Sequence, residues 1–234
     1  PETALGFFSY DNDICRELYG NAVCNKFLAG ADGGLAHAEG ISLDEGGTSF
    51  TLKIEGEEGV RCNTTLLGKH NISNICLAAA VAYKIGLSPK EIADGVNRLK
   101  AVEHRLEMVT NNHNIKIIDD SYNSNRDGAR AALEVLSSFE GRKIVLTPGL
   151  VELGKEENLE NFEFGREIAE VADKLIVIGK HNAEMLIKGW YEGGRGNEDI
   201  MFAKSLEKGN ALLNGIMRAG DVVLFENDLP DTYS

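Results

Sequence analysis

This sequence of 234 residues lacks long apolar runs, a visible secretory leader and cysteine pairs with metal or redox spacing. No stretch of about 18 apolar residues occurs, so we expect no membrane-spanning helix. No basic segment precedes an apolar one, so no secretory signal is visible. Because of the missing signal and the absence of any C-x-x-C pair, we expect reduced, structural thiols rather than disulfides. The four cysteines are Cys15, Cys24, Cys62 and Cys76.

Positive charge is also scarce. The chain has 24 Lys and Arg against 37 Asp and Glu, which gives a net charge of -13. Binding of nucleic acid through a broad basic face needs clustered Lys and Arg, so we expect no nucleic-acid partner. A polyanionic ligand would need local positive charge, a helix N-terminus or a bound metal.

Two motifs that cradle phosphate are missing. The sequence contains no G-x-x-x-x-G-K-[ST] loop, and no G-x-G-x-x-G follows a predicted strand. No serine nucleophile elbow and no Cys–His pair stands out. The first residue is Pro1 rather than methionine, and we expect that the natural protein has a region upstream of it.

The first part of the chain changes from strand patterns to helix patterns. Residues 1 to 67 predict short strands and turns, with a hairpin over residues 48 to 67. Apolar periodicity then predicts a helix from Asn71 to Ile85. A second helix should follow Ser88, which forms a capping box with Glu91, and its buried face should be Ile92, Val96 and Leu99.

Residues 100 to 113 are the expected domain junction, and after them strands and helices alternate. The predicted strands cover residues 115–119, 143–146, 175–178, 200–203 and 222–225. The predicted helices cover residues 128–139, 158–171, 181–190 and 205–217. Apolar strands separated by helices at this spacing indicate an α/β fold with a parallel sheet and right-handed crossovers.

Polar residues gather where the predicted strands end. In a parallel sheet the reactive edge lies beyond the carboxyl ends of the strands, so we expect these residues on one rim. The first strand leads into residues 119–125, the second into residues 151–154, and the last into residues 226–228. Asp120 and Asn123 are alternatively only turn and cap residues, which these types favour. Both interpretations stay open.

Gly68 to Asn71 lie where a strand meets the first predicted helix. Gly68 permits a close backbone approach or a positive φ. The helix N-terminus offers free N–H groups to an anion. Asn71 and Asn74 are three residues apart, so both can project from the first turn toward a ligand. Alternatively, Asn71 is only the N-cap.

Arg105 follows the second helix, within the expected junction. A planar and permanently charged guanidinium suits phosphate oxygens. The alternative is a surface ion pair with Glu103 or Glu107, which would contribute at most about 1 kcal/mol.

These pieces together resemble the Mur ligases, and within that family the MurF type. The resemblance lies in four motifs: G-x-H-N-x-x-N at 68–74, H-R-L-E at 104–107, I-D-D-S-Y-N at 118–123 and V-E-L-G at 151–154. It runs from about residue 20 to the end. It implies that residues 1–108 are the carboxy-terminal half of the central ATP-binding domain and that residues 109–234 are a Rossmann-like carboxy-terminal domain.

The resemblance also implies an activity. Mur ligases use ATP and Mg²⁺ to activate a peptide carboxylate of a UDP-muramoyl peptide as an acyl phosphate, which the amine of an amino acid or dipeptide then displaces. The expected setting is the synthesis of peptidoglycan precursors in the cytoplasm. This chain alone should not turn over, because the phosphate loop and the amino-terminal domain would lie upstream of Pro1.

Site residues are implied position by position. His70 and Asn71 match the motif beside the nucleotide and metal, so His70 is a candidate catalytic residue and metal ligand. Asn74 matches the asparagine near adenine, and Arg105 matches the arginine that contacts ATP. The remaining implied residues are Asp120, Tyr122 and Asn123 for the ribose loop, and Glu152, Asn227 and Asp228 for the amine substrate.

The chain departs from the MurF pattern at three places. Residues 124–126 are Ser-Asn-Arg where Ala-Asn-Pro is usual, residues 147–150 are Thr-Pro-Gly-Leu where Leu-Gly-Asp-Met is usual, and residues 226–228 replace a Lys-Gly-Ser type loop. The last two face the incoming amine in the family, so the identity of the amine stays open. The alternatives are another branch of the superfamily, such as a folylpolyglutamate or cyanophycin-type ligase, or a non-catalytic binding module. The oligomeric state is also open.

Overall fold

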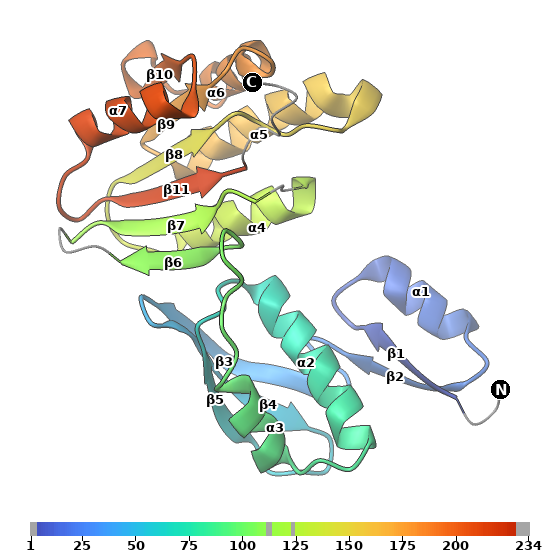
Figure 1. The fold of residues 1–234 in the computed structure, drawn as a ribbon. Helices are drawn as coiled ribbons and strands as arrows, with labels where there is room; N and C mark the ends of the chain where they lie inside the picture. The colour runs from blue at the N-terminus through green and yellow to red at the C-terminus, as the bar shows by residue number, and fades with distance from the viewer. Residues whose placement is uncertain (1–3, 111–113, 123–124, 228–234) are drawn as a thin grey trace. The chain divides into compact units, whose positions relative to one another are not determined.

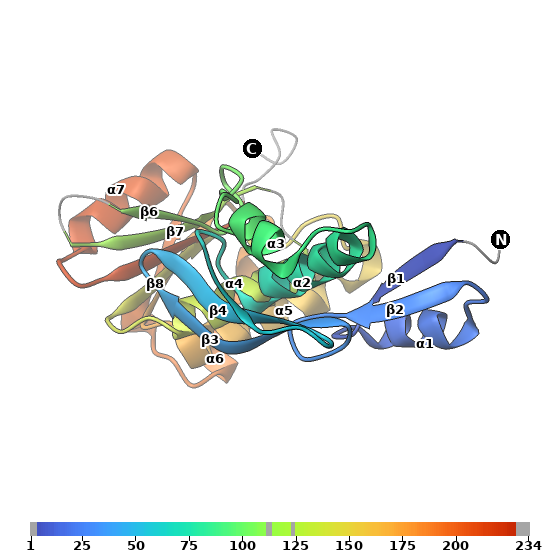
Figure 2. The ribbon, with the colours of Figure 1, turned by 90° about the horizontal axis from the view of Figure 1, so that it is seen from below.

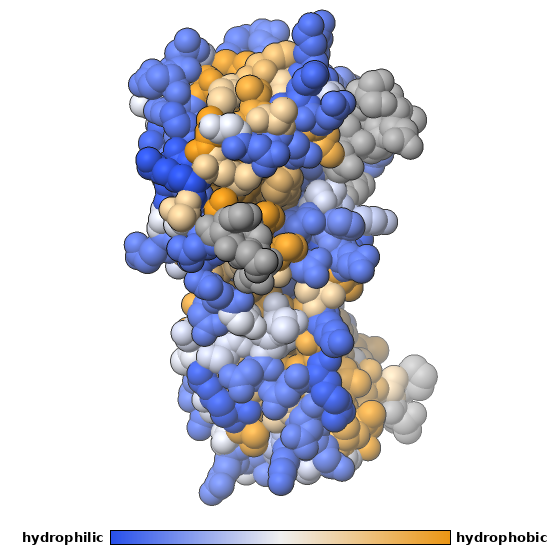
Figure 3. All heavy atoms as spheres, turned by 60° about the vertical axis from the view of Figure 1, so that its left-hand side comes forward, coloured by the Kyte–Doolittle hydropathy of each residue, from blue (hydrophilic) through white to orange (hydrophobic). Residues whose placement is uncertain are grey.

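The computed structural model describes residues 4–110, 114–122 and 125–227, and its helices and strands are labelled in Figure 1. The chain divides into two units, Pro1–Ala101 and Val102–Ser234. Each has its own core and is described by itself. Among the described residues, no helix is long and apolar enough to cross a membrane. On the side shown in Figure 3, hydrophilic residues surround smaller apolar patches.

The first unit contains two small sheets and three helices. Its strands are β1 (Leu5–Ser9), β2 (Asn25–Ala29), β3 (Ala36–Asp44), β4 (Gly47–Ile54) and β5 (Val60–Thr64). Its helices are α1 (Asp13–Asn21), α2 (Lys69–Lys84) and α3 (Pro89–Val96). Strands β1 and β2 are parallel, whereas β3, β4 and β5 form an antiparallel sheet. Helices α1 and α2 both contact the β1–β2 pair (Figures 1 and 2).

The core of this unit follows from two periodicities. Phe50, Leu52 and Ile54 alternate along β4 and are all at most 2% exposed. Apolar residues of α2, such as Ile72 and Cys76, belong to the same core. The predicted hairpin over residues 48–67 and the helix that follows it are therefore confirmed.

Two predictions for this unit were wrong. Helix α1 lies in a region that was expected to hold only strands and turns. Asn12 caps it by accepting a hydrogen bond from the N–H of Cys15 at 2.9 Å, and none of its nine residues is buried. Helix α3 has the predicted capping box, but it ends at Val96, and Leu99 beyond it is 39% exposed.

The second unit is a six-stranded sheet in the order β10-β9-β8-β11-β7-β6. The strands are β6 (Glu107–Thr110), β7 (Lys116–Asp120), β8 (Lys143–Thr147), β9 (Lys174–Ile178), β10 (Ile200–Ala203) and β11 (Val222–Glu226). All neighbours pair in parallel except β6, which runs antiparallel to β7. The parallel sheet is thus confirmed, whereas β6 lies in residues that were expected to be only a junction.

Helices cover both faces of this sheet. They are α4 (Arg126–Ser137), α5 (Glu157–Val171), α6 (Ala183–Glu192) and α7 (Leu206–Ile216), with short 3-10 turns at Gly154–Glu156 and Asn197–Asp199. Figure 1 shows α7 on one face and α4, α5 and α6 on the other. This arrangement follows from right-handed crossovers, because only the connection through α7 runs back from β10 to the centre of the sheet.

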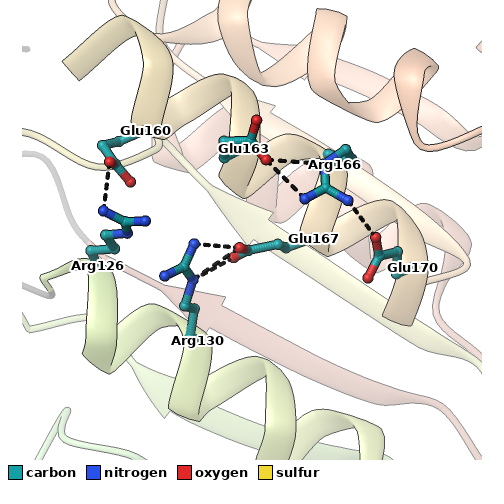
Figure 4. Close-up of polar contacts among 7 residues, drawn as sticks. All are labelled: Arg126, Arg130, Glu160, Glu163, Arg166, Glu167 and Glu170. Atoms are coloured by element: carbon teal, nitrogen blue, oxygen red, sulfur yellow. Dashed lines mark hydrogen bonds and ion pairs between the residues drawn. The ribbon is translucent and has the colours of Figure 1, made fainter. Parts of the chain in front are cut away.

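Ion pairs join α4 to α5 (Figure 4). Arg126 pairs with Glu160 at 2.8 Å, and the Arg130 guanidinium approaches both carboxylate oxygens of Glu167 at 2.5–3.0 Å. Along α5, Arg166 pairs with Glu163 and Glu170. These contacts fix the helix that begins a few residues after Tyr122.

A buried ion pair lies at the amino ends of the neighbouring central strands β8 and β11. Asp221, which is 1% exposed, accepts hydrogen bonds from Nε and Nη2 of Arg142 at 3.0 and 2.6 Å. The backbone N–H of Arg218 donates to the same carboxylate at 2.8 Å. Removing the carboxylate would leave the N–H of Arg218 without this acceptor and the Arg142 guanidinium with the carbonyl oxygen of Ile216, to which Nη2 donates at 2.7 Å.

We predict that Asp221→Ala lowers the free energy of unfolding of this unit by about 3 kcal/mol. Urea unfolding followed by the fluorescence of the fully buried Trp190 measures the loss. Asp199→Ala is the matched control, because Asp199 pairs with Lys174 at 2.6 Å where the side chains are 28% and 24% exposed. It should cost at most about 1 kcal/mol. Equal losses for the two variants would contradict the prediction.

Candidate functional site

The polar strand ends of the second unit meet on one edge of its sheet, as predicted. Glu226 at the end of β11 pairs in register with Asp120 at the end of β7. The N–H of Asn227 donates to the carbonyl oxygen of Asp120 at 3.0 Å. Strand β8 runs parallel on the other side of β11, so the turn after Thr147 reaches the same edge.

The first residues of the second unit are fastened to this edge. We call residues 102–106 the strap. The carbonyl oxygen of His104 accepts a hydrogen bond from the N–H of Tyr122 at 3.0 Å. The N–H of Leu106 donates to Oδ1 of Asp120 at 2.9 Å, and the Leu106 side chain is 5% exposed. The strap therefore brings Arg105 beside the end of β7.

Arg105 lies over an aromatic ring. Its guanidinium carbon is 4.2 Å from the centre of the Tyr122 ring, and Tyr122 is 54% exposed. Within the described residues the structure has no ion pair between Arg105 and Glu103 or Glu107, so the alternative of a surface ion pair is wrong. A guanidinium over a ring leaves its N–H groups able to reach a ligand.

Asp119 and Asp120 are neighbours whose pKa values are shifted in opposite directions. Burial acts to raise the pKa of Asp119, but hydrogen bonds from Ser121 and His104 outweigh it, so the pKa lies below its usual value. Burial raises the pKa of Asp120, and the N–H of Leu106, the side-chain contact with Glu226 and the charge of Arg105 do not cancel this effect. Glu226 is fully buried, so two carboxyl groups lie side by side at this edge.

Buried asparagines hold the turn that follows β8. Asn227 donates from Nδ2 to the carbonyl oxygen of Gly149 at 2.7 Å. Asn161 accepts from the N–H of Leu150 and donates back to its carbonyl oxygen, both at 2.8 Å, and Asn182 donates to that same oxygen at 2.8 Å. We call Asn161, Asn182 and Asn227 the asparagine support.

The candidate amine residues take different places around this turn. Asn227 is 4% exposed and supports the turn, so direct contact with an amine stays a prediction. Glu152 is exposed and has a φ of 65° in the left-handed region. Asp228 and Asn123 lie outside the described residues. The sequence places Asn182 at the polar end of the third strand, on the same rim, but assigns it no role, and it misses Asn161, which looks like an ordinary residue of α5.

The predicted residues of the first unit lie at the start of α2. Gly68 has a φ of 87° and is the N-cap, which rules out the N-cap alternative for Asn71. Asn71 donates from Nδ2 to the carbonyl oxygen of Leu67 at 2.8 Å. His70 and Asn74 have exposed side chains in the first two turns. Their roles stay predictions.

Asp11 organises the same region and was missed by the sequence analysis. Its carboxylate accepts hydrogen bonds from the N–H groups of Ala31 and Asp32 at 2.5 and 3.0 Å, and from the hydroxyl of Ser73 in α2. Asp32 pairs with Lys69 at 2.7 Å. The sequence shows only that Asp11 is an acid shortly after a strand. An ordinary turn residue would look the same, so the sequence pattern does not reveal its role.

The acidic, histidine and cysteine side chains bear on the expected metal. In the described parts of the chain, no group of three or more His, Cys, Asp or Glu side chains could hold a metal ion. Mg²⁺ bound together with phosphates, and His70 as its ligand, both stay predictions. All four cysteines are free thiols, as expected, and burial raises the pKa of Cys76 to about 12.

Comparison with known protein families matches both units. The model described as the Mur ligase middle domain matches residues 2–82. The model described as the Mur ligase, glutamate ligase domain matches residues 104–226. Together they cover most of the chain.

Individual relatives are longer than this chain. A UDP-N-acetylmuramoylalanine–D-glutamate ligase of Pelotomaculum thermopropionicum is 32% identical over 80% of this chain and 39% of the relative. A UDP-N-acetylmuramoyl-tripeptide–D-alanyl-D-alanine ligase of Escherichia coli is 30% identical over 78% of this chain and 41% of the relative. The chain thus spans about 40% of the length of these relatives.

Solved structures show the same fold. A MurF structure from Acinetobacter baumannii superposes with a TM-score of 0.82 at 24% identity, and covers 97% of this chain and 49% of its own. A MurF structure from Thermotoga maritima in complex with ADP gives 0.80 at 22% identity, over 97% of this chain and 50% of its own. The predicted fold class is therefore confirmed.

Substituting Asp119 and substituting Asp120 should change the stability of the protein in opposite directions. Because the folded pKa of Asp120 is raised, its contribution to stability is present below its usual pKa and is lost as pH rises through the folded pKa. Asp120→Asn should therefore unfold at a higher temperature than the wild type at about pH 8, and at the same temperature near pH 4.

Asp119→Asn should behave in the opposite way. The folded pKa of Asp119 is lowered, so its contribution is present above the usual pKa and is lost as pH falls through the folded pKa. The variant should therefore be less stable than the wild type at neutral pH. Thermal unfolding followed by Trp190 fluorescence measures both, and shifts of the same sign at neutral pH would contradict the assignment.

Proposed function

Because this chain belongs to the Mur ligase family, we propose that it is the nucleotide- and amine-binding part of an ATP-dependent amide ligase of peptidoglycan precursor synthesis. In this proposal the first unit, which ends at Ala101 rather than at the expected residue 108, is the carboxy-terminal half of the central ATP-binding domain, and the second unit is the carboxy-terminal domain. The complete enzyme would work in the cytoplasm. Its phosphate-binding loop would come from residues outside this chain, which spans less than half of its curated relatives.

The proposed reaction joins an acid to an amine in two steps. A carboxylate oxygen of a UDP-muramoyl peptide attacks the γ-phosphorus of ATP, the bond to the β-phosphate oxygen breaks, and ADP leaves. The amine nitrogen of an amino acid or dipeptide then attacks the acyl carbon, phosphate leaves with the acyl C–O bond broken, and the nitrogen loses a proton. Mg²⁺, when bound with the nucleotide, would neutralise charge on its phosphates.

Such a reaction needs positioning and charge neutralisation rather than a protein nucleophile. Arg105 would supply positive charge to the phosphates, and Asp120 would accept a hydrogen bond from the ribose, next to Tyr122. His70, Asn71 and Asn74 of the first unit would bind the nucleotide through the start of α2. This division of roles agrees with the absence of a nucleophile motif in the sequence.

One observation carries the proposal most directly. Arg105 and Tyr122 are in contact although 16 positions separate them in the sequence, and Asp120 binds the N–H of the residue after Arg105. A cation, an aromatic ring and an acid thus share one sheet edge at the carboxyl end of β7. Ligands of open α/β sheets bind at such edges.

The amine has two candidates with separate support. The relatives include ligases of D-glutamate and of D-alanyl-D-alanine, at 32% and 30% identity. The residues after β8 and β11 differ from the usual MurF pattern, and these residues would face the amine. We therefore propose two candidate amine substrates, D-glutamate and D-alanyl-D-alanine, each of which would react with its own UDP-muramoyl acceptor.

We expect the full-length protein to release phosphate from ATP only when a UDP-muramoyl acid and an amine are both present. The assay pairs UDP-muramoyl-alanine with D-glutamate and the UDP-muramoyl-tripeptide with D-alanyl-D-alanine. One pair should exceed the other by at least about tenfold, the discrimination expected from a few polar contacts. Hydrolysis at the same rate without acceptor and amine would contradict the ligase activity. A folate substrate offered with glutamate tests the alternative of a folylpolyglutamate-type ligase. If ATP binds but none of these substrate pairs supports turnover, a non-catalytic binding module is favoured.

Asp120→Ala tests the nucleotide site in the same protein. Loss of a charge-assisted hydrogen bond to ribose should weaken ATP binding by about 1.5–3 kcal/mol, measured by calorimetric titration. Asp127→Ala is the matched control, because Asp127 is an exposed acid in the first turn of α4 and has no proposed role. Unchanged ATP affinity in Asp120→Ala would remove Asp120 from the site.

A further inference from the structure

The strap has an unusual backbone on both sides of Arg105. His104 has a φ of 62° and Leu106 has a φ of 49°, and neither residue is glycine. Such left-handed conformations of ordinary residues cost about 1–3 kcal/mol each and persist only where surrounding contacts fix them. The contacts at Leu106 are the bond to Asp120 and burial of its side chain.

At His104 the fixing contacts come from both backbone and side chain. The carbonyl oxygen binds the N–H of Tyr122, and Nδ1 of the imidazole lies 2.9 Å from Oδ2 of Asp119. The other oxygen of Asp119 accepts hydrogen bonds from the hydroxyl and the N–H of Ser121 at 2.6 and 3.1 Å. Asp119 is therefore itself held in place before it meets His104.

Stability alone does not account for this pair. The His104 side chain is 59% exposed, and an exposed ion pair contributes at most about 1 kcal/mol. Glycine adopts the same φ without strain, so a strap that only had to turn here would gain from glycine. The turn of the backbone does not require histidine here. What histidine adds is a side-chain tie between the residue before Arg105 and Asp119 at the end of β7.

We propose that His104 and Asp119 are positioning residues that hold Arg105 over Tyr122 in the orientation used for the nucleotide. Neither residue has to touch ATP. The inference rests on the proposed function, and it adds two residues to the site for which the sequence motifs suggested no role. It also divides the tasks at the end of β7: the carboxylate of Asp119 binds the side chain of His104, whereas the carboxylate of Asp120 binds the backbone N–H of Leu106.

The tie has an electrostatic component. The hydrogen bond with Asp119 and its charge raise the pKa of His104, burial lowers it, and Glu103 of the strap and Glu107 of β6 raise it further. The charged form of His104 therefore persists to a higher pH than usual. As pH rises through this pKa the charge is lost, and the tie weakens to a neutral hydrogen bond.

The test uses the full-length ligase with His104→Gly and Asp119→Asn. His104→Gly removes the imidazole while allowing the same φ, so its effect reports the lost tie rather than backbone strain. We expect each variant to raise the KM for ATP by about tenfold, with kcat at saturating ATP changed by less than about threefold. Glu103→Gln, which removes a nearby charge but no hydrogen bond, is the control and should leave the KM for ATP unchanged.

A double-mutant cycle separates positioning from general support. In an Arg105→Ala background, His104→Gly should raise the KM no further, because the residue it positions is gone. An equal additional rise in that background would overturn the inference, and so would a wild-type KM in both single variants. Absence of ATP-dependent phosphate release by the wild type would instead overturn the proposed function and this inference together.

A second measurement does not depend on activity. In the chain of 234 residues, NMR titration should show a lower pKa for the imidazole of His104 in Asp119→Asn than in the wild type, and a smaller change in Glu103→Gln. In the wild-type ligase the KM for ATP should rise with pH through the pKa of His104, and in His104→Gly this rise should disappear. An unchanged imidazole pKa in Asp119→Asn would overturn the tie.

Discussion

The attachment of the strap to the end of β7 is the contact on which the candidate site depends. Consecutive acids at the strand end take different roles there, because Asp119 meets the His104 imidazole and Asp120 meets the N–H of Leu106. Arg105 lies between these contacts, and its guanidinium lies on the Tyr122 ring. Without these contacts, nothing in the strap would fix the position of the Arg105 guanidinium relative to the end of β7.

Burial and charge act against each other at this edge. A sheet covered by helices on both faces places its strand ends in poor contact with water, which disfavours ionised carboxyl groups. Hydrogen bonds from Ser121 and His104 overcome this effect for Asp119, but the donors around Asp120 do not overcome it. One strand end therefore carries an acid that is readily ionised beside one that is not.

Much of the fold could be predicted from the sequence, because long amphipathic helices and apolar parallel strands have strong periodicity. The capping box at Ser88 and the positive φ at Gly68 were local and were therefore visible. Helix α1 and strand β6 were missed, since α1 buries no residue and the four residues of β6 are too few to show alternation. The strand ends could be placed on one edge, but Asp11, Asn161 and Asn182 act through residues distant in sequence.

The asparagine support binds only main-chain atoms of the turn after β8. Gly149 is tied to its place, because its φ is 90° and a Cβ atom there would lie 2.3 Å from Oδ1 of Asn161. The side chains on either side of it are buried, and the hydroxyl of Thr147 accepts a hydrogen bond from the N–H of Gly149 at 3.0 Å. The turn is therefore held on every side as far as Val151, and the first side chain after it that reaches solvent is Glu152.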